Sequence, residues 1–276
     1  MRARVSNPPL DVETRHVPPP QVAPGRSLGI DLAAQPRDTA ACVIEWDGDQ
    51  GQVLPVDEAS SLDDEALLEL VRDPGTTRVA IDAPFGWPLE FVEALVAYRD
   101  RTEWPIDDMR ALWFRETDRE VKRVTGQKAL SVSTEWIVYP AMRCARLLSQ
   151  LAAEGWDIDR SGIGRVLEVY PAAAMRQWGL DPRKYKGDDP PNVARRRELI
   201  EQLLAKVGTR LQVPARFVEL CGADDDQFDA LICALTSRAV ELGRCDPIPE
   251  DLRWRAQQEG WIHLPDREFL QDLAAA

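Results

Sequence analysis

The first third of the chain alternates short apolar runs with turn residues, a pattern that predicts a β-sheet. Residues 28–34 form an apolar run interrupted by Asp31, and residues 39–46 form a second run rich in small and branched side chains. The Asp-Gly pair within 47–51 is typical of a hairpin turn, so residues 52–56 are expected to form a third strand. Three consecutive strands are therefore predicted.

The rest of the chain combines helical periodicity with two further apolar runs. Residues 78–81 and 164–170 are those runs, and the first has the continuous apolar character of a strand buried in a parallel sheet. Apolar residues at helical spacing predict helices at 63–72, 89–101, 172–178, 192–207 and 228–242. Residues 107–154 are predicted to be mostly helical, with a break near Gly126. Residues 260–265 are a candidate for a short terminal strand. An α/β fold with a mixed five-stranded sheet flanked by helices follows.

The two ends of the chain differ from its middle. Residues 1–25 hold six prolines and no apolar signal-peptide core, so a disordered leader is expected there. Residues 26–265 are expected to form one domain with a helical insertion at about 89–160, followed by a C-terminal tail at 266–276. No apolar run is long enough to cross a membrane, so we expect a cytoplasmic protein without a membrane partner.

Composition narrows the possible chemistry. The chain has a formal net charge of −13, which disfavours nucleic-acid binding over the whole surface. Lys and Arg gather, however, in residues 110–150 and 176–197, where a locally basic surface can meet an anionic substrate. The only histidines are His16 and His263, which argues against a histidine zinc site or a Ser-His-Asp triad. The five cysteines form no Cys-x-x-Cys pair and are expected to be buried thiols.

Carboxylates in apolar surroundings are the strongest chemical signal in the sequence. Asp31, Asp82 and Glu168 each interrupt or end an apolar run, and Asp226 and Asp229 open a late apolar helix. A carboxylate in such a place is costly unless it is paired or holds a metal ion. Ordinary structural roles remain open beside this one: a turn for the first two, and a favourable helix-dipole contact for the last two.

The succession of predicted elements is that of the ribonuclease-H-like fold, and the placement of the acids resembles the RuvC-type Holliday-junction resolvases. Six segments are similar to the prokaryotic family catalogued as domain of unknown function 429, described as predicted nucleases of that fold: 29–34, 81–88, 115–118, 168–173, 185–186 and 229–235. The resemblance extends over about 27–265. It implies a three-layer ribonuclease-H-like fold with a helical insertion after the fourth strand.

In such a fold the first and fourth strands are neighbours, which places Asp31 beside Asp82 at the carboxyl end of the sheet. The leading hypothesis is a metal-dependent nuclease that hydrolyses DNA or RNA by a two-metal carboxylate mechanism. Its expected cofactor is Mg²⁺ or Mn²⁺, because these ions prefer oxygen ligands. The expected catalytic residues are Asp31, Asp82, Glu168 and Asp229, and the expected metal ligands are Asp31, Asp82, Asp226 and Asp229. For Glu168 two roles are open: it binds a metal ion, or it holds the loop after the fourth strand.

Basic and aromatic residues near these acids are candidates for holding the substrate. The expected substrate-binding residues are Trp87, Arg115, Asp118, Tyr185, Lys186 and Arg196. Trp87 follows the fourth strand and is a candidate for stacking on a nucleobase. Arg115 and Asp118 are equally consistent with a surface ion pair, and part of the arginine run at 195–197 is expected to face solvent.

Two further functions remain open from the sequence. One is an ATP-dependent phosphotransferase of the actin and sugar-kinase superfamily, although the chain contains no Walker-type loop. The other is a non-catalytic adaptor that keeps the fold without the chemistry. Tight ATP binding would favour the first, and failure of the folded protein to bind Mg²⁺ or Mn²⁺ would favour the second. The sequence does not give the oligomeric state; the resemblance implies that a homodimer is possible, since RuvC-like enzymes are commonly dimers.

Overall fold

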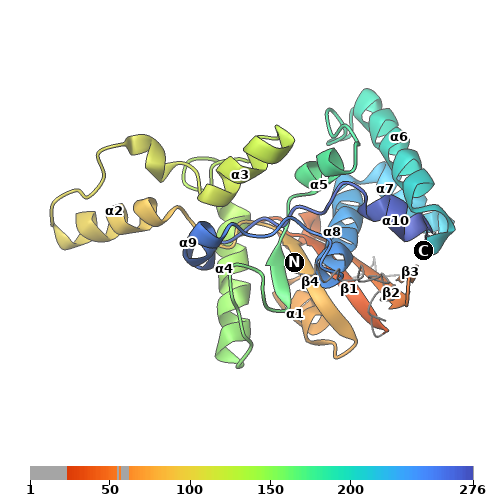
Figure 1. The fold of residues 1–276 in the computed structure, drawn as a ribbon, viewed down its shortest axis with the longest axis horizontal. Helices are drawn as coiled ribbons and strands as arrows, with labels where there is room; N and C mark the ends of the chain where they lie inside the picture. Colours follow the sequence, from red (N-terminus) through yellow and green to blue (C-terminus); the bar gives the residue numbers. More distant parts are fainter. Residues whose placement is uncertain (1–23, 55, 57–61, 276) are drawn as a thin grey trace, which may run out of the picture.

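The computed structural model describes residues 24–54, 56 and 62–275. Nearly all of the predicted leader lies outside the described residues, and its last residue, Gly25, begins the first strand. The protein has a mixed α/β fold in which helices flank one sheet (Figure 1).

The sheet has six strands in the order β5-β4-β1-β2-β3-β6. Their bounds are β1 Gly25–Asp31, β2 Ala40–Asp47, β3 Gln50–Leu54, β4 Thr76–Asp82, β5 Val166–Glu168 and β6 Leu211–Gln212. The first three strands are antiparallel neighbours, whereas β4 runs parallel to β1 and β5 runs parallel to β4. Both β1 and β4 therefore end at the same edge of the sheet.

The prediction of five strands is corrected by β6, which pairs in parallel with β3. A strand of two residues is too short to produce a readable alternation in the sequence. The candidate strand at 260–265 takes part only in isolated bridges, which pair Glu168 with Ile262 and Cys245 with Pro265.

Helices cover both faces of the sheet. On one face, α1 (Asp64–Arg72) and α4 (Val138–Ala153) pack against apolar side chains of β1, β2 and β4. On the other face, the long helix α8 (Asp225–Glu241) packs along β1, β2 and β4. Helices that extend this second layer are α5 Pro171–Gln177, α6 Pro190–Val207, α7 Ala215–Ala223 and α10 Phe269–Ala275. The segment predicted as a tail thus contributes α10, whose Phe269, Leu270 and Leu273 are buried.

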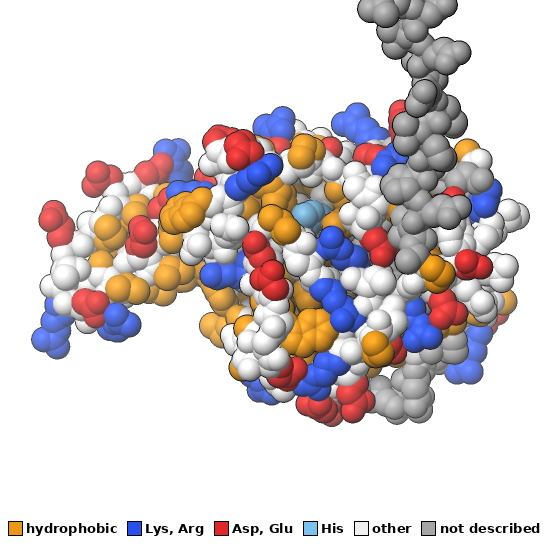
Figure 2. All heavy atoms as spheres, turned by 60° about the horizontal axis from the view of Figure 1, so that its bottom comes forward, with side chains coloured by type: hydrophobic (Ala, Val, Ile, Leu, Met, Phe, Trp, Pro, Cys, Tyr) orange, Lys and Arg blue, Asp and Glu red, His pale blue; other side chains and the backbone are white. Residues whose placement is uncertain are grey.

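Between β4 and β5 the chain forms α2 (Leu89–Asp100), α3 (Glu116–Thr125) and then α4. Helix α2 projects from the body of the molecule (Figure 1), and apolar side chains are exposed among charged ones over this projection (Figure 2). The base of the projection is fixed by Glu259, a buried residue at the end of α9 (Arg253–Glu259). Its carboxylate accepts hydrogen bonds from the N–H groups of Leu89 and Glu116, so it caps both α2 and α3.

Four short 3₁₀ turns complete the described elements: η1 Pro36–Asp38, η2 Met109–Leu112, η3 Gly208–Arg210 and η4 Glu250–Leu252. Within the described part of the chain, no helix combines the length and the apolar character that crossing a membrane requires.

Candidate metal centre and its pocket

Three aspartates meet at the carboxyl edge of the sheet. Asp31 and Asp82 are the last residues of β1 and β4, and the parallel register pairs them directly. Asp229 reaches the same point from the second turn of α8. Each of the three offers a carboxylate oxygen, and these oxygens all lie within 4.8 Å of one another. The predicted neighbourhood of Asp31, Asp82 and Asp229 is therefore present.

The absence of a side chain at Gly29 allows α8 to come this close to β1. A Cβ placed on Gly29 would lie 2.2 Å from the carbonyl oxygen of Ala230 and 2.2 Å from the nitrogen of Ala234, both in the backbone of α8. No other residue fits such an approach, which explains a glycine in the interior of a central strand. The same close packing brings Asp229 to the strand ends.

The charge of this acidic centre is only partly compensated within the protein. Asp229 is fully buried and Asp31 is 9% exposed. Burial raises the pKa of Asp31 well above its usual value; Lys186 opposes this shift, and the other carboxylates add to it. The Oδ2 atom of Asp31 is buried and has no hydrogen-bond partner among the described residues. A buried, unpartnered oxygen beside two further carboxylates fits a bound divalent cation.

The loop before α6 supplies the groups that contact Asp229. The hydroxyl of Tyr185 lies 2.8 Å and 3.0 Å from the two carboxylate oxygens of Asp229 and donates to them. The ammonium of Lys186 lies 2.6 Å from Asp229 Oδ2, and its side chain is about half-exposed. Burial lowers the pKa of this ammonium, but the surrounding carboxylates hold it well above its usual value. Lys186 is therefore a cation at the rim of the centre.

Arg196, predicted to bind substrate, instead holds this loop through hydrogen bonds from the interior of the protein. It is fully buried. Its guanidinium donates to the carbonyl oxygens of Tyr185 (2.6 Å) and Gly187 (3.2 Å) and to that of Ala223 (2.7 Å), next to the start of α8. A run of arginines in the sequence gave no sign that this one points inward. The role of Arg196 is to position Tyr185 and Lys186.

A second buried charge cluster lies beside the acidic centre and contains three of the predicted site residues. Arg115 pairs with Glu168 (2.7 Å) and with Asp118 (2.9 Å), and all three side chains are almost fully buried. Glu168 also accepts the N–H of Phe85, in the loop that follows Asp82. Arg115 and Asp118 therefore form a buried ion pair and not a surface pair. Both line the pocket next to Asp82, and their role in binding substrate stays a prediction. Glu168 lies outside the three-carboxylate group. Its hydrogen bond to Phe85 confirms the other predicted role, which is to hold the loop after the fourth strand.

Asp226 and Trp87 also lie outside the acidic centre. Asp226 is not part of the three-carboxylate group, and it lines a separate hollow on the other side of the α8 N-terminus. The i, i+3 spacing placed Asp226 and Asp229 on one helix face, but only the second residue is deep enough to reach the strand ends. Trp87 is half-buried and does not line the pocket next to Asp82.

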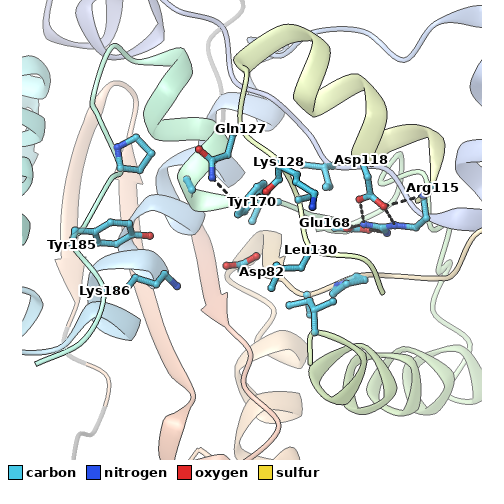
Figure 3. A pocket seen from close by; sticks show the side chains of 18 of the residues that line it. Asp82, Arg115, Asp118, Gln127, Lys128, Leu130, Glu168, Tyr170, Tyr185 and Lys186 are labelled. Atoms are coloured by element: carbon cyan, nitrogen blue, oxygen red, sulfur yellow. Dashed lines mark hydrogen bonds and ion pairs between the residues drawn. The ribbon is translucent and has the colours of Figure 1, made fainter. Parts of the chain in front are cut away.

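A pocket of about 490 Å³ opens beside Asp82. Figure 3 shows the carboxylate of Asp82 at its centre, with Tyr185 and Lys186 on one side and Leu130 on the other. Four polar lining residues were not predicted as functional: Gln127, Lys128, Tyr170 and Lys184. The first two follow the helix break at Gly126 that the sequence does reveal, but no pattern in the sequence indicates that this segment folds back over the sheet edge.

The protonation of Asp82 leads to a prediction about pH. Burial raises the pKa of this carboxyl from 3.8 to about 7, although Lys186 opposes the shift. The folded state binds this proton more tightly than the unfolded state does, so protonation of Asp82 stabilises the fold. This stabilisation is complete below about pH 3.8 and is lost as the pH rises through 7. We expect the melting temperature of the metal-free protein to fall between pH 5 and pH 8, measured by calorimetry in EDTA.

Asp82→Asn is the control for this pH effect, because it removes the titrating group at nearly constant size. The variant should show a flatter dependence of melting temperature on pH than the wild type. Millimolar Mg²⁺ should raise the wild-type melting temperature more at pH 8 than at pH 5, since the ion and the proton compete for the same oxygens. A metal-free melting temperature that rises from pH 5 to pH 8, with no change in Asp82→Asn, would contradict the assignment.

Comparison with known proteins identifies one family. A family model described as protein of unknown function (DUF429) matches residues 29–253 of the 276-residue chain. The matched region contains Asp31, Asp82 and Asp229, together with the loop that carries Tyr185 and Lys186. Neither the search of curated proteins nor the search of solved structures found a match.

Proposed function

The chain belongs to the DUF429 family, and from its acidic centre we propose that it is a metal-dependent nuclease with a ribonuclease-H-like fold. The observation that carries the proposal is the convergence of Asp31, Asp82 and Asp229 within 4.8 Å at the edge of the sheet. The order of the first five strands, with β1 to β3 antiparallel and β4 and β5 parallel to β1, supports the fold assignment.

The three carboxylates are the groups that would hold Mg²⁺ or Mn²⁺. When bound, such an ion would polarise a phosphodiester and make a water molecule more acidic. Together with Lys186, the three aspartates carry a formal charge of −2, which one divalent cation balances. A single ion, with Lys186 as the second positive group, is therefore our preferred composition of the site over the two ions expected from the sequence.

The protein's own residues prepare the site for a phosphate group. Lys186 is half-exposed on the pocket wall, where its ammonium can contact a phosphate oxygen while it remains beside Asp229. Tyr185 holds the carboxylate of Asp229 in one orientation through its hydroxyl. Arg196 fixes the loop that carries both residues, so their positions are set before substrate binds.

A cleavage screen tests the proposal. Single-stranded, duplex and branched DNA and RNA are incubated with the purified protein in Mg²⁺, in Mn²⁺ and in EDTA. We expect cleavage of at least one of these substrates with either ion and none in EDTA. Cleavage that persists in EDTA, or the absence of cleavage under every condition, would contradict a metal-dependent nuclease.

Lys186→Met tests whether Lys186 acts as the second positive group. The substitution removes a positive charge that lies 2.6 Å from Asp229, so the net negative charge of the three aspartates is less compensated. The variant should therefore bind Mn²⁺ about tenfold more tightly than the wild type does. Cleavage should nevertheless slow, because the phosphate loses a positive partner. Mn²⁺ affinity is measured by calorimetry, and turnover is measured at saturating Mn²⁺.

The matched control is Lys184→Met, which removes a lysine two positions away that makes no ion pair with the three aspartates. Its Mn²⁺ affinity should stay within about threefold of the wild-type value, as expected for a more distant exposed charge. If Lys186→Met weakens Mn²⁺ binding, or if both variants change it equally, Lys186 is not the competing cation described above.

A further inference from the structure

The pocket beside Asp82 is a concave hollow of limited size, partly open to solvent. Its volume of about 490 Å³ lies in the range of pockets that enclose one small organic molecule. A base-paired duplex cannot place its bases in such a space, whereas one unpaired or extruded nucleotide can. The size of the pocket therefore limits what can sit next to the acidic centre.

The pocket has one apolar wall and one charged wall. Leu130, Ile137 and Ile262 supply apolar surface, and Figure 3 shows Leu130 across Asp82 from Lys186. Such an apolar wall fits a flat, weakly polar body such as a nucleobase. The charged wall, with Asp82 and Lys186, is continuous with the proposed metal centre.

Polar groups at the pocket can read a base edge. The side-chain amide of Gln127 donates to the hydroxyl of Tyr170 (3.2 Å), and that hydroxyl lies 3.4 Å from the carbonyl oxygen of Lys128. These contacts orient the amide of Gln127 at the pocket wall. The oriented oxygen can accept a hydrogen bond from an exocyclic amine.

Lysines surround the opening in a protein with an acidic overall charge. Lys128, Lys184 and Lys186 all line the pocket. Lys184 adopts a left-handed backbone conformation (φ 57°), which is unusual for a residue other than glycine. This turn allows Lys184, Tyr185 and Lys186 to line the pocket together. Three lysines on one pocket favour the binding of an anion there.

From these observations we propose that the pocket binds a single nucleotide unit, with its base against the apolar wall and its phosphate between the lysines and the acidic centre. The inference rests on the proposed function, because it assigns the substrate of the same centre. It identifies the substrate as an end of a strand, an unpaired or extruded nucleotide, or a free nucleotide derivative, and it excludes the interior of an intact duplex.

Binding and turnover test the pocket separately. For binding, adenosine 5′-monophosphate is compared with ribose 5-phosphate, which lacks the base, by calorimetry in Mg²⁺. For turnover, thymidine 5′-(4-nitrophenyl phosphate) is compared with methyl 4-nitrophenyl phosphate. We expect the wild type to bind the nucleotide at least tenfold more tightly than the sugar phosphate. We also expect a kcat/KM at least tenfold higher for the nucleoside ester than for the methyl ester.

Ile137→Trp fills the apolar wall with a larger side chain and should reduce both of these preferences at least tenfold. Ile163→Trp makes the same substitution at a site that is 66% exposed and outside the pocket, and it should keep both preferences. Thermal melting establishes that each variant is folded. If Ile137→Trp does not fold, Leu130→Asp replaces it, since Leu130 is 51% exposed and an acidic group there should also weaken nucleotide binding.

The outcomes separate this inference from the proposed function. If methyl 4-nitrophenyl phosphate is hydrolysed in a metal-dependent reaction but the two ligands bind equally, the nucleotide pocket is overturned and the nuclease chemistry stands. If the nucleotide is preferred and Ile137→Trp removes the preference, the pocket is supported even when no phosphodiester is cleaved. A preference that Ile137→Trp and Ile163→Trp change equally overturns the assignment of the base to this wall.

Discussion

Asp31→Asn is expected to slow metal-dependent phosphodiester cleavage by about 1000-fold or more, which corresponds to about 4 kcal/mol of lost transition-state stabilisation. Asn has nearly the size of Asp but lacks its charge, so the variant removes one of three converging carboxylates with little change in packing. The Oδ2 atom of Asp31 is buried without a hydrogen-bond partner among the described residues, so it is available to bind a metal ion, and an amide there supplies a weaker, uncharged ligand. The measurement is kcat in Mg²⁺ and in Mn²⁺ on the substrate that the wild type cleaves best.

Thermal melting distinguishes lost chemistry from lost structure in this variant. Without metal, a buried carboxylate beside two others is unfavourable for the folded state, and a neutral amide relieves that cost. Metal-free Asp31→Asn should therefore melt at the same temperature as the wild type or higher. Mg²⁺ should stabilise the wild type but have little effect on the variant, because the stabilisation by a ligand follows its affinity for the folded state.

Asp226→Asn is the matched control, since it makes the same change at an acidic residue one turn away on α8 that lies outside the three-carboxylate group. Its cleavage rate should stay within about tenfold of the wild-type rate. If Asp31→Asn cleaves like the wild type, the acidic centre is not catalytic. If Asp226→Asn is as impaired as Asp31→Asn, the ligand set includes both residues.

The acidic centre could be predicted from the sequence because its signals are local. Asp31 and Asp82 each end an apolar run, and the succession of elements placed their strands side by side, as the parallel register now shows. Asp229 was recognisable because a purely apolar helix face follows it. In each case a few neighbouring residues were enough to show that the carboxylate lies in an apolar environment, where burying a charge is energetically unfavourable.

The roles of the basic residues could not be predicted in the same way, because they depend on partners far away in the chain. Arg115 pairs with a carboxylate 53 positions away, and Arg196 donates to a carbonyl 27 positions away. A sequence shows that an arginine is present but not whether a distant acid or carbonyl lies beside it. Both residues therefore resembled exposed phosphate-binding groups, although both are buried.

The pocket was missed for a further physical reason. Its walls come from separate segments, which include the ends of β4 and β5, residues 127–130 and residues 182–186. Only the packing of the helical insertion against the sheet edge brings these segments together. The two-residue strand β6 and the helix α10 were missed because short elements give little periodicity, and their positions are set by tertiary contacts.

Arg115→Met is expected to lower the free energy of unfolding by about 3–5 kcal/mol, which makes it the most destabilising single substitution considered for this protein. Met fills much of the space of the arginine stem but leaves the carboxylates of Glu168 and Asp118 buried without their cation. Both carboxylates are almost fully excluded from solvent, so water cannot replace the lost partner. Denaturation in urea, followed by circular dichroism, measures the change.

Loss of the Arg115 cation should also affect the acidic centre. Glu168 accepts a hydrogen bond from the N–H of Phe85, which lies in the loop that follows Asp82. At a denaturant concentration where Arg115→Met remains folded, its Mg²⁺ affinity should be lower than that of the wild type. Arg119→Met is the matched control on the same helix. The Arg119 side chain, which pairs with Glu116, is 41% exposed, so loss of this ion pair should cost at most about 1 kcal/mol.

Equal stabilities for the two variants would show that the buried cluster of Arg115, Asp118 and Glu168 does not hold this part of the fold. A destabilised Arg115→Met with unchanged Mg²⁺ affinity would show that the cluster supports the fold but does not position the Asp82 loop.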